Sequence, residues 1–298
     1  MAYVLIATLL FSFVGPVAKL VPHGAGLISF YRAAFATAAL GAVLALGRRP
    51  RRQELAALFA GDGAGGRARA ASTHLALGLL ISGNWYFYVR AVQVSSVAIA
   101  VVCLFTYPLL TALLEPLFFG EPYRVWDLLS GALVLIGVVT IVERFSLSEA
   151  SALGAVYGLF ASASLTLRNL LSRRAVRTQS PELVGLIQFA IAACVFFPFV
   201  LGEAQLPAPR DLLLLALIGG GLTMVSQVLF IAALRQLSTS LASLIVSLQP
   251  ILATLIALAL LGEVPGPRTL LGGALVLGAV VLALAMNPRR RALPVARG

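Results

Sequence analysis

Apolar runs of about twenty residues fill most of this chain of 298 residues, with short polar segments between them. A helix needs about 20 mainly apolar residues to cross a bilayer, and it satisfies its own backbone hydrogen bonds there. The strands of a transmembrane barrel would alternate apolar and polar residues, which these runs do not do. The sequence therefore predicts an all-α integral membrane protein.

The low content of charged residues supports this interpretation. Charged residues make up 11% of the sequence and apolar residues 60%, whereas soluble domains carry roughly 25% charged residues. The net charge of +11 could indicate a nucleic-acid partner, but the basic residues gather in a few loops and in the tail. They are better explained as signals of membrane topology, so the lipid bilayer is an expected partner and nucleic acid is not.

Hydropathy divides the chain into ten predicted spans. They cover residues 3–21, 25–47, 73–93, 96–119, 124–142, 150–171, 181–201, 211–234, 238–261 and 266–286. About fifteen arginines lie in the even-numbered loops and the tail, against about four in the odd-numbered loops. By the positive-inside rule, both termini are predicted to lie in the cytoplasm, in a multi-pass protein of the cell inner membrane.

The chain contains one three-span stretch twice. Residues 84–141 recur as residues 226–283 without a gap, with about 17 identities in 58 positions. The identities place Pro108 on Pro250 and align a Gly-Glu pair and a Gly-Ala-Leu-Val-Leu run. Shared leucine and alanine could arise from composition, but Pro, Gly and Glu in register indicate duplication.

The duplication predicts the domain organisation. The first repeat covers residues 1–142, a loop covers residues 143–149, the second repeat covers residues 150–286, and a basic cytoplasmic tail covers residues 287–298. Five spans per repeat is an odd number, so the second repeat enters the membrane from the opposite face. Inverted repeats of this kind form a central site near the membrane midplane, and rocking exposes that site to each side in turn.

Pro108 and Pro250 lie in the middle of spans 4 and 9, at equivalent positions. Proline lacks an N–H and clashes with the carbonyl four residues earlier, so it would free the carbonyls of Leu104 and Val246 and bend both helices. Freed backbone groups survive in a bilayer only where protein or water meets them. The two prolines are therefore predicted to be gating hinges that face the cavity. The alternative is a packing kink without substrate contact.

Aromatic and amide side chains gather in spans 3 and 8. Such a mix of aromatic bodies and polar groups suits a small amphipathic organic ligand. An interfacial aromatic belt is the alternative, but the residues of span 3 lie near its middle rather than at its ends. The predicted substrate-binding residues are Asn84, Trp85, Tyr88, Tyr107, Tyr157, Gln227 and Arg32. Among them, Arg32 is expected to line the outer vestibule and to meet a carboxylate.

Glu115 lies a little over one helical turn before the cytoplasmic end of span 4. A carboxylate inside the membrane is costly and is by default a candidate for function. Its predicted partner is Arg168, at the cytoplasmic end of span 6. The pair is interpreted as a structural ion pair, with a role in proton or substrate coupling as the alternative. The sequence shows no metal-binding cluster, nucleotide-binding loop or catalytic motif, so neither a metal nor a cofactor is expected.

Several segments resemble a known family of membrane proteins. The sequences FYRAAFA at 30–36, GEP at 120–122 and GALVLIGV at 131–138 are similar to the EamA domain of the drug/metabolite transporter superfamily, and residues 233–283 resemble its second copy. The resemblance implies a ten-helix transporter of two inverted repeats with a central cavity, often exporting amino acids or other metabolites. The aromatic span 3 and the segment YPLLTALLEP resemble the aromatic amino-acid exporter branch. The chain departs from the family pattern at Gln188, where an arginine is expected, so a symmetric mechanism with two arginines is in doubt.

These observations predict a secondary transporter that moves a small-molecule substrate by alternating access, most simply an exporter of amino acids, aromatic ones included, or of related metabolites. A multidrug or other metabolite permease is the alternative. An intramembrane enzyme acting on lipid-linked substrates would need several convergent acidic or histidine side chains, and among them Glu115 alone lies at membrane depth. Because both copies are fused in one chain, the protein is expected to be able to act as a monomer.

Overall fold

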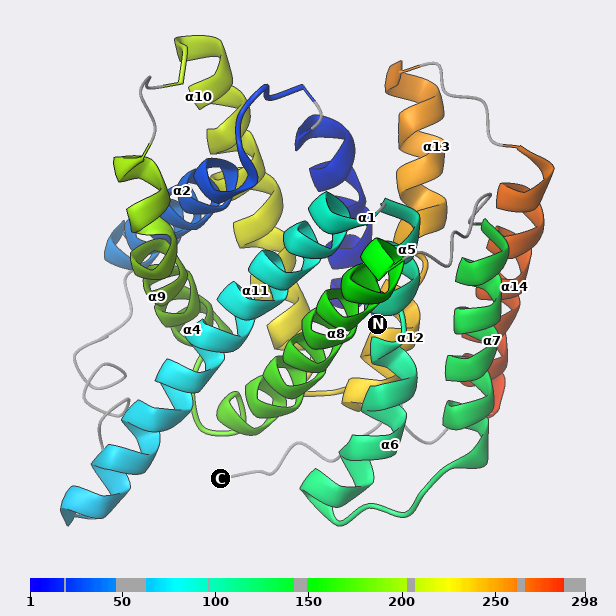
Figure 1. Ribbon diagram of the computed structural model, residues 1–298. Helices are drawn as coiled ribbons and strands as arrows, with labels where there is room; N and C mark the ends of the chain where they lie inside the picture. Colours follow the sequence, from blue (N-terminus) through cyan, green and yellow to red (C-terminus); the bar gives the residue numbers. More distant parts are fainter. Residues whose placement is uncertain are drawn as a thin grey trace.

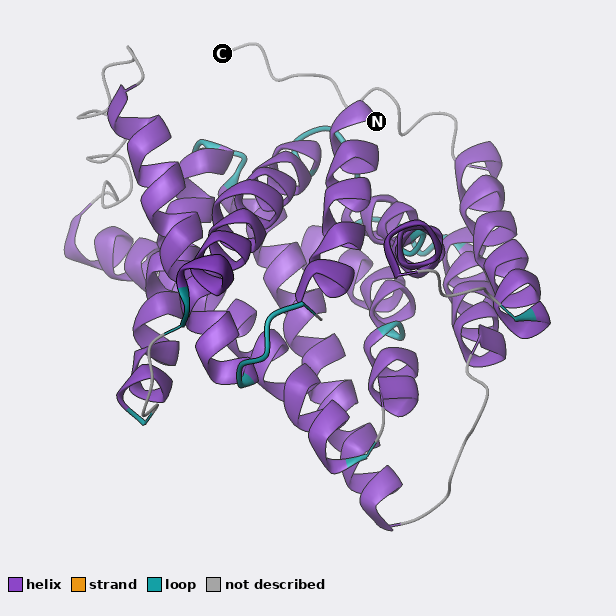
Figure 2. Cartoon of the chain, turned by 90° about the horizontal axis from the view of Figure 1, so that it is seen from above, coloured by secondary structure: helices purple, strands orange, loops and turns teal. Residues whose placement is uncertain are grey.

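The fold is built from helices. The structure is a computed structural model, and it describes residues 1–18, 20–46, 63–95, 97–141, 149–202, 207–261 and 266–286. Figures 1 and 2 show these residues as helices joined by short loops, and no strand occurs among them. The prediction of an all-α fold is thereby confirmed for the described residues.

The helices follow the apolar runs along the chain. In the first half they are α1 (Ala2–Ala18), α2 (Ala25–Leu46), α4 (Gly63–Val94), α5 (Val97–Leu104), α6 (Tyr107–Phe119) and α7 (Val125–Ile141). In the second half they are α8 (Glu149–Ala175), α9 (Pro181–Leu201), α10 (Pro209–Ala216), η1 (Leu217–Thr223), α11 (Met224–Ala233), α12 (Thr239–Val246), α13 (Gln249–Leu261) and α14 (Pro267–Met286).

Some helices extend beyond the predicted ends of their spans. Helix α4 begins at Gly63 rather than at residue 73, and α8 continues to Ala175 rather than ending at residue 171. Hydropathy detects the apolar part of a helix, while the helix itself continues into polar sequence at its ends. The extension of α8 matters for the site, because it adds basic residues to the last turn of a packed helix.

Within the part of the chain that the structure describes, four helical stretches are long and apolar enough to cross a membrane. They are Ala25–Leu46, Ile99–Phe119, Pro181–Leu201 and Pro209–Ala233. Shorter apolar helices are Ala2–Ala18, Val125–Thr140, Thr239–Ala253 and Leu270–Met286. Large apolar side chains such as Leu117, Leu213 and Leu270 remain exposed on the outside of the helices, as expected of a surface that meets lipid rather than water. The number of spans and their inverted arrangement stay predictions at this point.

Both predicted proline bends coincide with two-residue turns that interrupt the helix. Helix α6 begins one residue before Pro108, and α13 begins one residue before Pro250. A proline in the first turn of a helix needs no partner for an N–H, so each proline starts a new helix. The turns that separate the helix pairs lie at residues 105–106 and 247–248.

A π-helical segment interrupts the stretch between residues 209 and 233. This segment, η1, has the sequence LIGGGLT and lies between α10 and α11. A Cβ atom on Gly219 would lie 2.6 Å from the carbonyl oxygen of Arg32, so glycine permits η1 to approach the backbone of α2 closely. At the offset of the duplication, residues 75–81 form ordinary α-helix. The two halves therefore differ here, and π-helical segments occur frequently at functional sites.

Helices of the two halves pack against each other at both edges of the molecule. Helix α7 packs against α14 and α2 packs against α9, as Figure 1 shows on its right and left sides, while α4 lies along α8 between these pairs. Between α7 and α14 the backbones approach closely, because a Cβ atom on Gly137 would lie 2.8 Å from the carbonyl oxygen of Gly272. Small residues permit such contacts between membrane helices.

The substitution Gly137→Ala is expected to lower the thermal midpoint of the purified protein by several degrees. The added methyl group meets backbone atoms of α14 that cannot rotate away, and overpacking of this kind costs about 1–3 kcal/mol. The matched control is Gly278→Ala, because nothing lies within 4 Å of its Cβ position and alanine favours a helix over glycine. Midpoints of both variants in detergent test this, and equal effects would contradict the packing argument.

Candidate functional site

A cavity of about 370 Å³ lies between the two halves of the chain. A volume of this size suits a small organic molecule. Its walls come from α1, α2, α4, α5 and α6 of the first half and from α8, α11, α12 and α13 of the second. The polar or amphipathic side chains that line it are Ser12, Arg32, Asn84, Trp85, Tyr88, Tyr107, Arg168, Asn169, Gln227 and Gln249.

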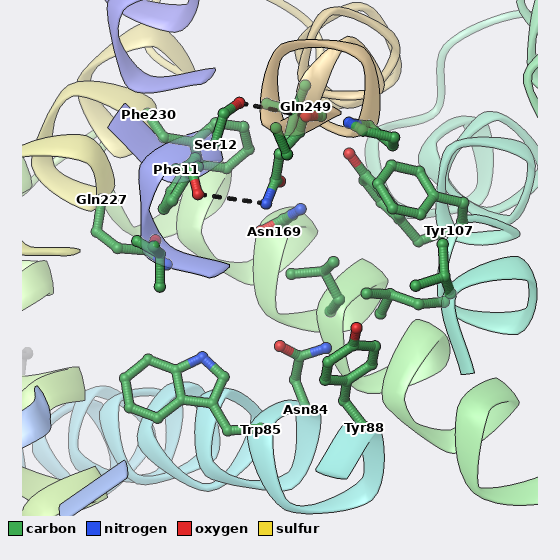
Figure 3. Close-up of a pocket in the computed structure, with 18 of the residues that line it drawn as sticks. Phe11, Ser12, Asn84, Trp85, Tyr88, Tyr107, Asn169, Gln227, Phe230 and Gln249 are labelled. Carbon is green, nitrogen blue, oxygen red and sulfur yellow. Dashed lines mark hydrogen bonds between the residues drawn. The ribbon is translucent and has the colours of Figure 1, made fainter. Parts of the chain in front are cut away.

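Helix α4 supplies one wall of the cavity. Asn84, Trp85 and Tyr88 lie on a shared helix face, and Figure 3 shows their side chains on the same side of the cavity. Tyr86 points elsewhere and is 41% exposed. The Trp85 ring is stacked at 6.2 Å from the ring of Phe196, which fixes the indole at the cavity wall. The three predicted residues of span 3 therefore line one cavity, and their contact with a substrate stays a proposal.

Arg168 on α8 is held by three amide oxygens. Its Nε donates to Gln188 Oε1 at 2.7 Å, Nη2 donates to Gln227 Oε1 at 2.7 Å, and Nη1 donates to Asn169 Oδ1 at 3.2 Å. The residue is 2% exposed. All three acceptors are neutral, so they orient the guanidinium group without cancelling its charge.

Arg32 on α2 lies against Trp85. Its Nε donates to Thr223 Oγ1 at 2.7 Å, and its guanidinium carbon lies 4.2 Å from the centre of the Trp85 ring. Thr223 is the last residue of η1, so the π-helical segment supplies the acceptor that orients this arginine. A guanidinium group on an indole face is a favourable cation–π arrangement. The structure thus places Arg32 in the cavity wall, over the indole.

The two helix breaks open onto the cavity at equivalent residues. Tyr107 and Gln249 are 142 positions apart, the offset of the duplication, and both line the cavity. The hydroxyl group of Tyr107 donates to the Ser243 carbonyl at 2.9 Å, and Gln249 Nε2 lies 3.5 Å from the Phe11 carbonyl (Figure 3). Each contact joins a segment beside a break to a helix of the other half.

The structure separates some predicted site residues from the cavity. Pro250 lines it, but Pro108 is buried beside it and is not among the described lining residues. Tyr157 is also absent from the described lining, and its ring is stacked at 6.2 Å from the Phe87 ring. The sequence groups Tyr157 with the other predicted substrate-binding residues because it is an aromatic residue in an apolar run. That pattern does not determine the direction in which a side chain points.

The predicted pairing of Glu115 with Arg168 is wrong. Glu115 Oε1 instead accepts from Arg173 Nη1 at 2.6 Å. The predicted end of span 6 at residue 171 leaves Arg173 outside the helix, whereas α8 continues to Ala175. The side chain of Arg168 is committed to the three amides of the cavity.

Glu115 is the centre of a buried polar cluster that joins the two halves. It is 1% exposed and accepts from the backbone N–H groups of Thr239 and Ser240 at the start of α12, and from the Ser240 hydroxyl group. Arg173 bridges it to Glu121, whose Oε1 lies 2.8 Å from Arg173 Nη2. A carboxylate at a helix N-terminus also interacts favourably with the helix dipole. These five residues are called the Glu115 cluster below.

Two site residues were missed by the sequence analysis, although signals for them exist. Gln249 stands beside Pro250 at the position equivalent to Tyr107, so the duplication itself could have identified it. Asn169 is a polar residue next to Arg168 within an apolar run. Gln188 departs from the family pattern, in which an arginine is expected. The structure gives a physical reason: an arginine there would face the guanidinium group of Arg168, which the amide oxygen of Gln188 holds.

Comparisons with known proteins assign the chain to a family. Residues 1–143 and 152–285 match the sequence profile of the EamA-like transporter family. RarD of Escherichia coli (strain K12) is 28% identical over 194 residues, which are 63% of this chain and 63% of RarD. YxxF of Bacillus subtilis (strain 168), an uncharacterized transporter, is 25% identical over 214 residues, which are 70% of this chain and 68% of YxxF. The matched region thus spans less than two thirds of the length of RarD.

A solved crystal structure of a protein that is 19% identical has the same fold, with a TM-score of 0.81 over 98% of both chains. The family profile covers nearly the whole chain in two successive matches, and the resemblance noted in the sequence is confirmed. The matched family is described as one of transporters, and the chain, with its long apolar helices, is a multi-pass membrane protein. It belongs to the EamA-like transporter family.

Proposed function

We propose that this transporter moves small organic solutes across the bacterial inner membrane by alternating access, with ten spans arranged as two inverted repeats at residues 1–142 and 150–286. The packing of the helices supports the inverted arrangement. Helix α4 packs on α8, and their counterparts α11 and α1 pack on each other. The pairs α2 with α9 and α7 with α14 join counterparts directly. Exchanging the two halves leaves this pattern of neighbours unchanged, as a two-fold relation between repeats requires.

The observation that carries the proposal is the cavity between the halves, with a broken helix of each half opening onto it. Broken helices near a midplane site are a recurring feature of secondary transporters. In each half, a proline starts the second segment of the broken helix. Because each proline lacks an N–H, such breaks are places where two helix segments can change their angle at the loss of few backbone hydrogen bonds. We assign the hinge role to the segments around Pro108 and Pro250.

The Glu115 cluster closes the cytoplasmic side of the cavity in this proposal. Glu115 and Arg173 belong to the ends of α6 and α8, and the distribution of arginines supports a cytoplasmic position for these ends. The cluster fastens α6 of the first half to α8 and α12 of the second. Opening towards the cytoplasm would have to separate these contacts. The structure then corresponds to a state in which the cytoplasmic side is closed.

Amino acids and related carboxylate metabolites are the substrates that the cavity suits best in this proposal. The aromatic side chains Trp85, Tyr88 and Tyr107 offer apolar surface, and the amides and arginines offer polar partners. Aromatic side chains pack well against aromatic ligands. The direction of net transport in this proposal is export, as the resemblance to exporters of the family implies.

Counterflow in proteoliposomes tests the function. Vesicles containing the purified protein are loaded with a mixed pool of amino acids and carboxylic acids, and uptake of labelled phenylalanine, tryptophan, threonine and a non-amino-acid amine is followed. We expect saturable exchange of at least one class. The substitution Trp85→Ala is expected to reduce it about tenfold, because aromatic packing worth about 0.5–1.5 kcal/mol is lost.

The matched control is Trp126→Ala, since this second tryptophan lies on α7 outside the cavity and is 42% exposed. It is expected to retain exchange. If no solute of the pool moves under either direction of the gradient, the transport proposal fails for these classes. Exchange of the amine alone would instead favour the multidrug permease.

A further inference from the structure

The charges of the cavity all have one sign. Of the residues that line it, Arg32 and Arg168 are ionised, and no aspartate or glutamate is present in the described lining. Three acidic side chains of the described residues pair with other groups: Glu115 and Glu121 with Arg173, and Asp211 with His23. The cavity therefore carries a formal charge of two positive units.

Burial raises the energetic cost of leaving this positive charge without a counter-charge. A charged side chain within a membrane protein normally finds a counter-charge, because neutral dipoles do not repay the loss of hydration in full. Arg168 is surrounded by amide oxygens from Gln188, Gln227 and Asn169. These amides use three of its five N–H groups and leave its charge uncancelled. A ligand with a negative charge would supply what the protein itself does not.

The two terminal nitrogens of Arg32 are available to donate hydrogen bonds to a ligand. Its Nε is bonded to Thr223 and its face lies on the Trp85 indole, so both the rotation and the plane of the guanidinium group are fixed. In the described part of the chain, its two terminal nitrogens make no hydrogen bond, and neither is among the buried atoms that lack a partner. Two adjacent N–H groups in a fixed plane match the two oxygens of a carboxylate.

The same lining is unfavourable for a cation. An ammonium group would meet amides, hydroxyl groups and aromatic rings, but no described carboxylate, and it would lie in the field of two guanidinium groups. At distances of a few ångströms and in low dielectric, repulsion between like charges is costly. An amino acid brings an ammonium group along with its carboxylate, whereas a simple organic acid does not.

We propose that the cavity is an organic-anion site in which the terminal nitrogens of Arg32 receive the carboxylate and Arg168 supplies the second positive charge. Acids without an ammonium group therefore bind more tightly than the matching amino acids, and the matching amines bind weakest. This inference names the substrate class of the proposed transporter and rests on that function for its biological meaning. Its binding prediction can be tested without transport.

The test uses the tryptophan that lies under Arg32 as its probe. The sequence contains two tryptophans, so the variant Trp126→Phe leaves Trp85 as the remaining reporter. Its fluorescence is titrated in detergent with four compounds of one skeleton: phenylpropionate, phenylalanine, phenylpropanol and phenylpropylamine. Thermal midpoints at saturating ligand give a second readout. We expect the lowest Kd for phenylpropionate, a higher Kd for phenylalanine and the highest for phenylpropylamine.

Variants of Arg32 test whether this residue causes the preference for the acid. In the same background, Arg32→Gln is expected to weaken phenylpropionate binding by about 10- to 100-fold and to leave phenylpropanol binding nearly unchanged, which also shows that the cavity remains folded. Arg32→Lys keeps the charge without the planar fork, so it should retain the preference for the acid with a weaker Kd. Arg69→Gln, at an exposed position near the start of α4, is the control and should bind like the parent.

Two results would overturn the inference: binding of phenylalanine or phenylpropylamine as tight as that of phenylpropionate, or no saturable response to any of the four compounds. A preference for the acid that survives Arg32→Gln would overturn the assignment to Arg32. These outcomes are separate from failure of transport. Anion binding without counterflow would contradict the proposed function alone, and counterflow without a preference for anions would contradict this inference alone.

Discussion

Replacing Glu115 with alanine is expected to destabilise the protein by about 3–5 kcal/mol, which would lower its thermal midpoint by roughly 10 °C. The reason is that the Glu115 carboxylate accepts hydrogen bonds both from Arg173 and from the first residues of α12. Its loss leaves Arg173 without its shortest ion pair and the first N–H groups of α12 without their acceptor. The measurement is the loss of monodisperse protein in detergent as temperature rises.

A double-mutant cycle separates this effect from the loss of side-chain bulk. The variants Glu115→Ala and Arg173→Ala should together cost clearly less than the sum of their separate effects, because the two residues act on one contact. The control is Glu182→Ala, which removes an acidic residue from the first turn of α9 and should cost only about 0.3–1 kcal/mol through the helix dipole. Additive effects would show that the Glu115 cluster does not act as a unit.

Replacing Arg168 with methionine is expected to reduce counterflow by about 100-fold or more and to lower the thermal midpoint less than Glu115→Ala does. Methionine fills much of the volume of arginine and removes a charge that the surrounding amides do not neutralise. The variant therefore removes one of the two positive charges that the cavity offers to the substrate. Counterflow and thermal midpoint are measured on the same preparation, so that loss of transport is not confused with loss of folded protein.

The variant Arg235→Met provides the matched comparison for Arg168→Met. Arg235 donates to the backbone carbonyls of Val176 and Gln179, outside the cavity. Its replacement should cost stability and leave counterflow of the remaining folded protein intact. If Arg168→Met kept counterflow within tenfold of the parent while Arg235→Met lost it, the placement of the functional charge in the cavity would be wrong.

The predicted wall of span 3 could be found from the sequence because helical periodicity determines which residues share a face. Asn84, Trp85 and Tyr88 follow this rule, and the structure groups them in one wall while Tyr86 points away. The breaks at Pro108 and Pro250 could be anticipated for a similar reason, since proline acts on its own backbone. In both cases the prediction depends only on neighbouring residues of the same helix.

Contacts between distant segments could not be derived in the same way. The partner of Glu115 depended on how far α8 continues beyond its apolar part, and hydropathy does not record that end. The orientation of Tyr157 could not be predicted because rotation of a mostly apolar helix about its axis is set by packing against neighbours rather than by its own sequence. The acceptor of Arg32 depended on η1, a change of helical winding for which Gly219–Gly221 gives only a weak signal.

The two positive charges of the cavity also bear on the energy source of transport. A solute that crosses as a monoanion carries electrical charge, and a membrane voltage of 100 mV acts on one charge with about 2.3 kcal/mol. When the cell interior is negative, this voltage expels the anion and supports a gradient of about 50-fold at equilibrium. In the proposed transporter, a cavity that accepts the solute in its anionic form would let the resting voltage drive export directly, with neither nucleotide hydrolysis nor a co-transported cation.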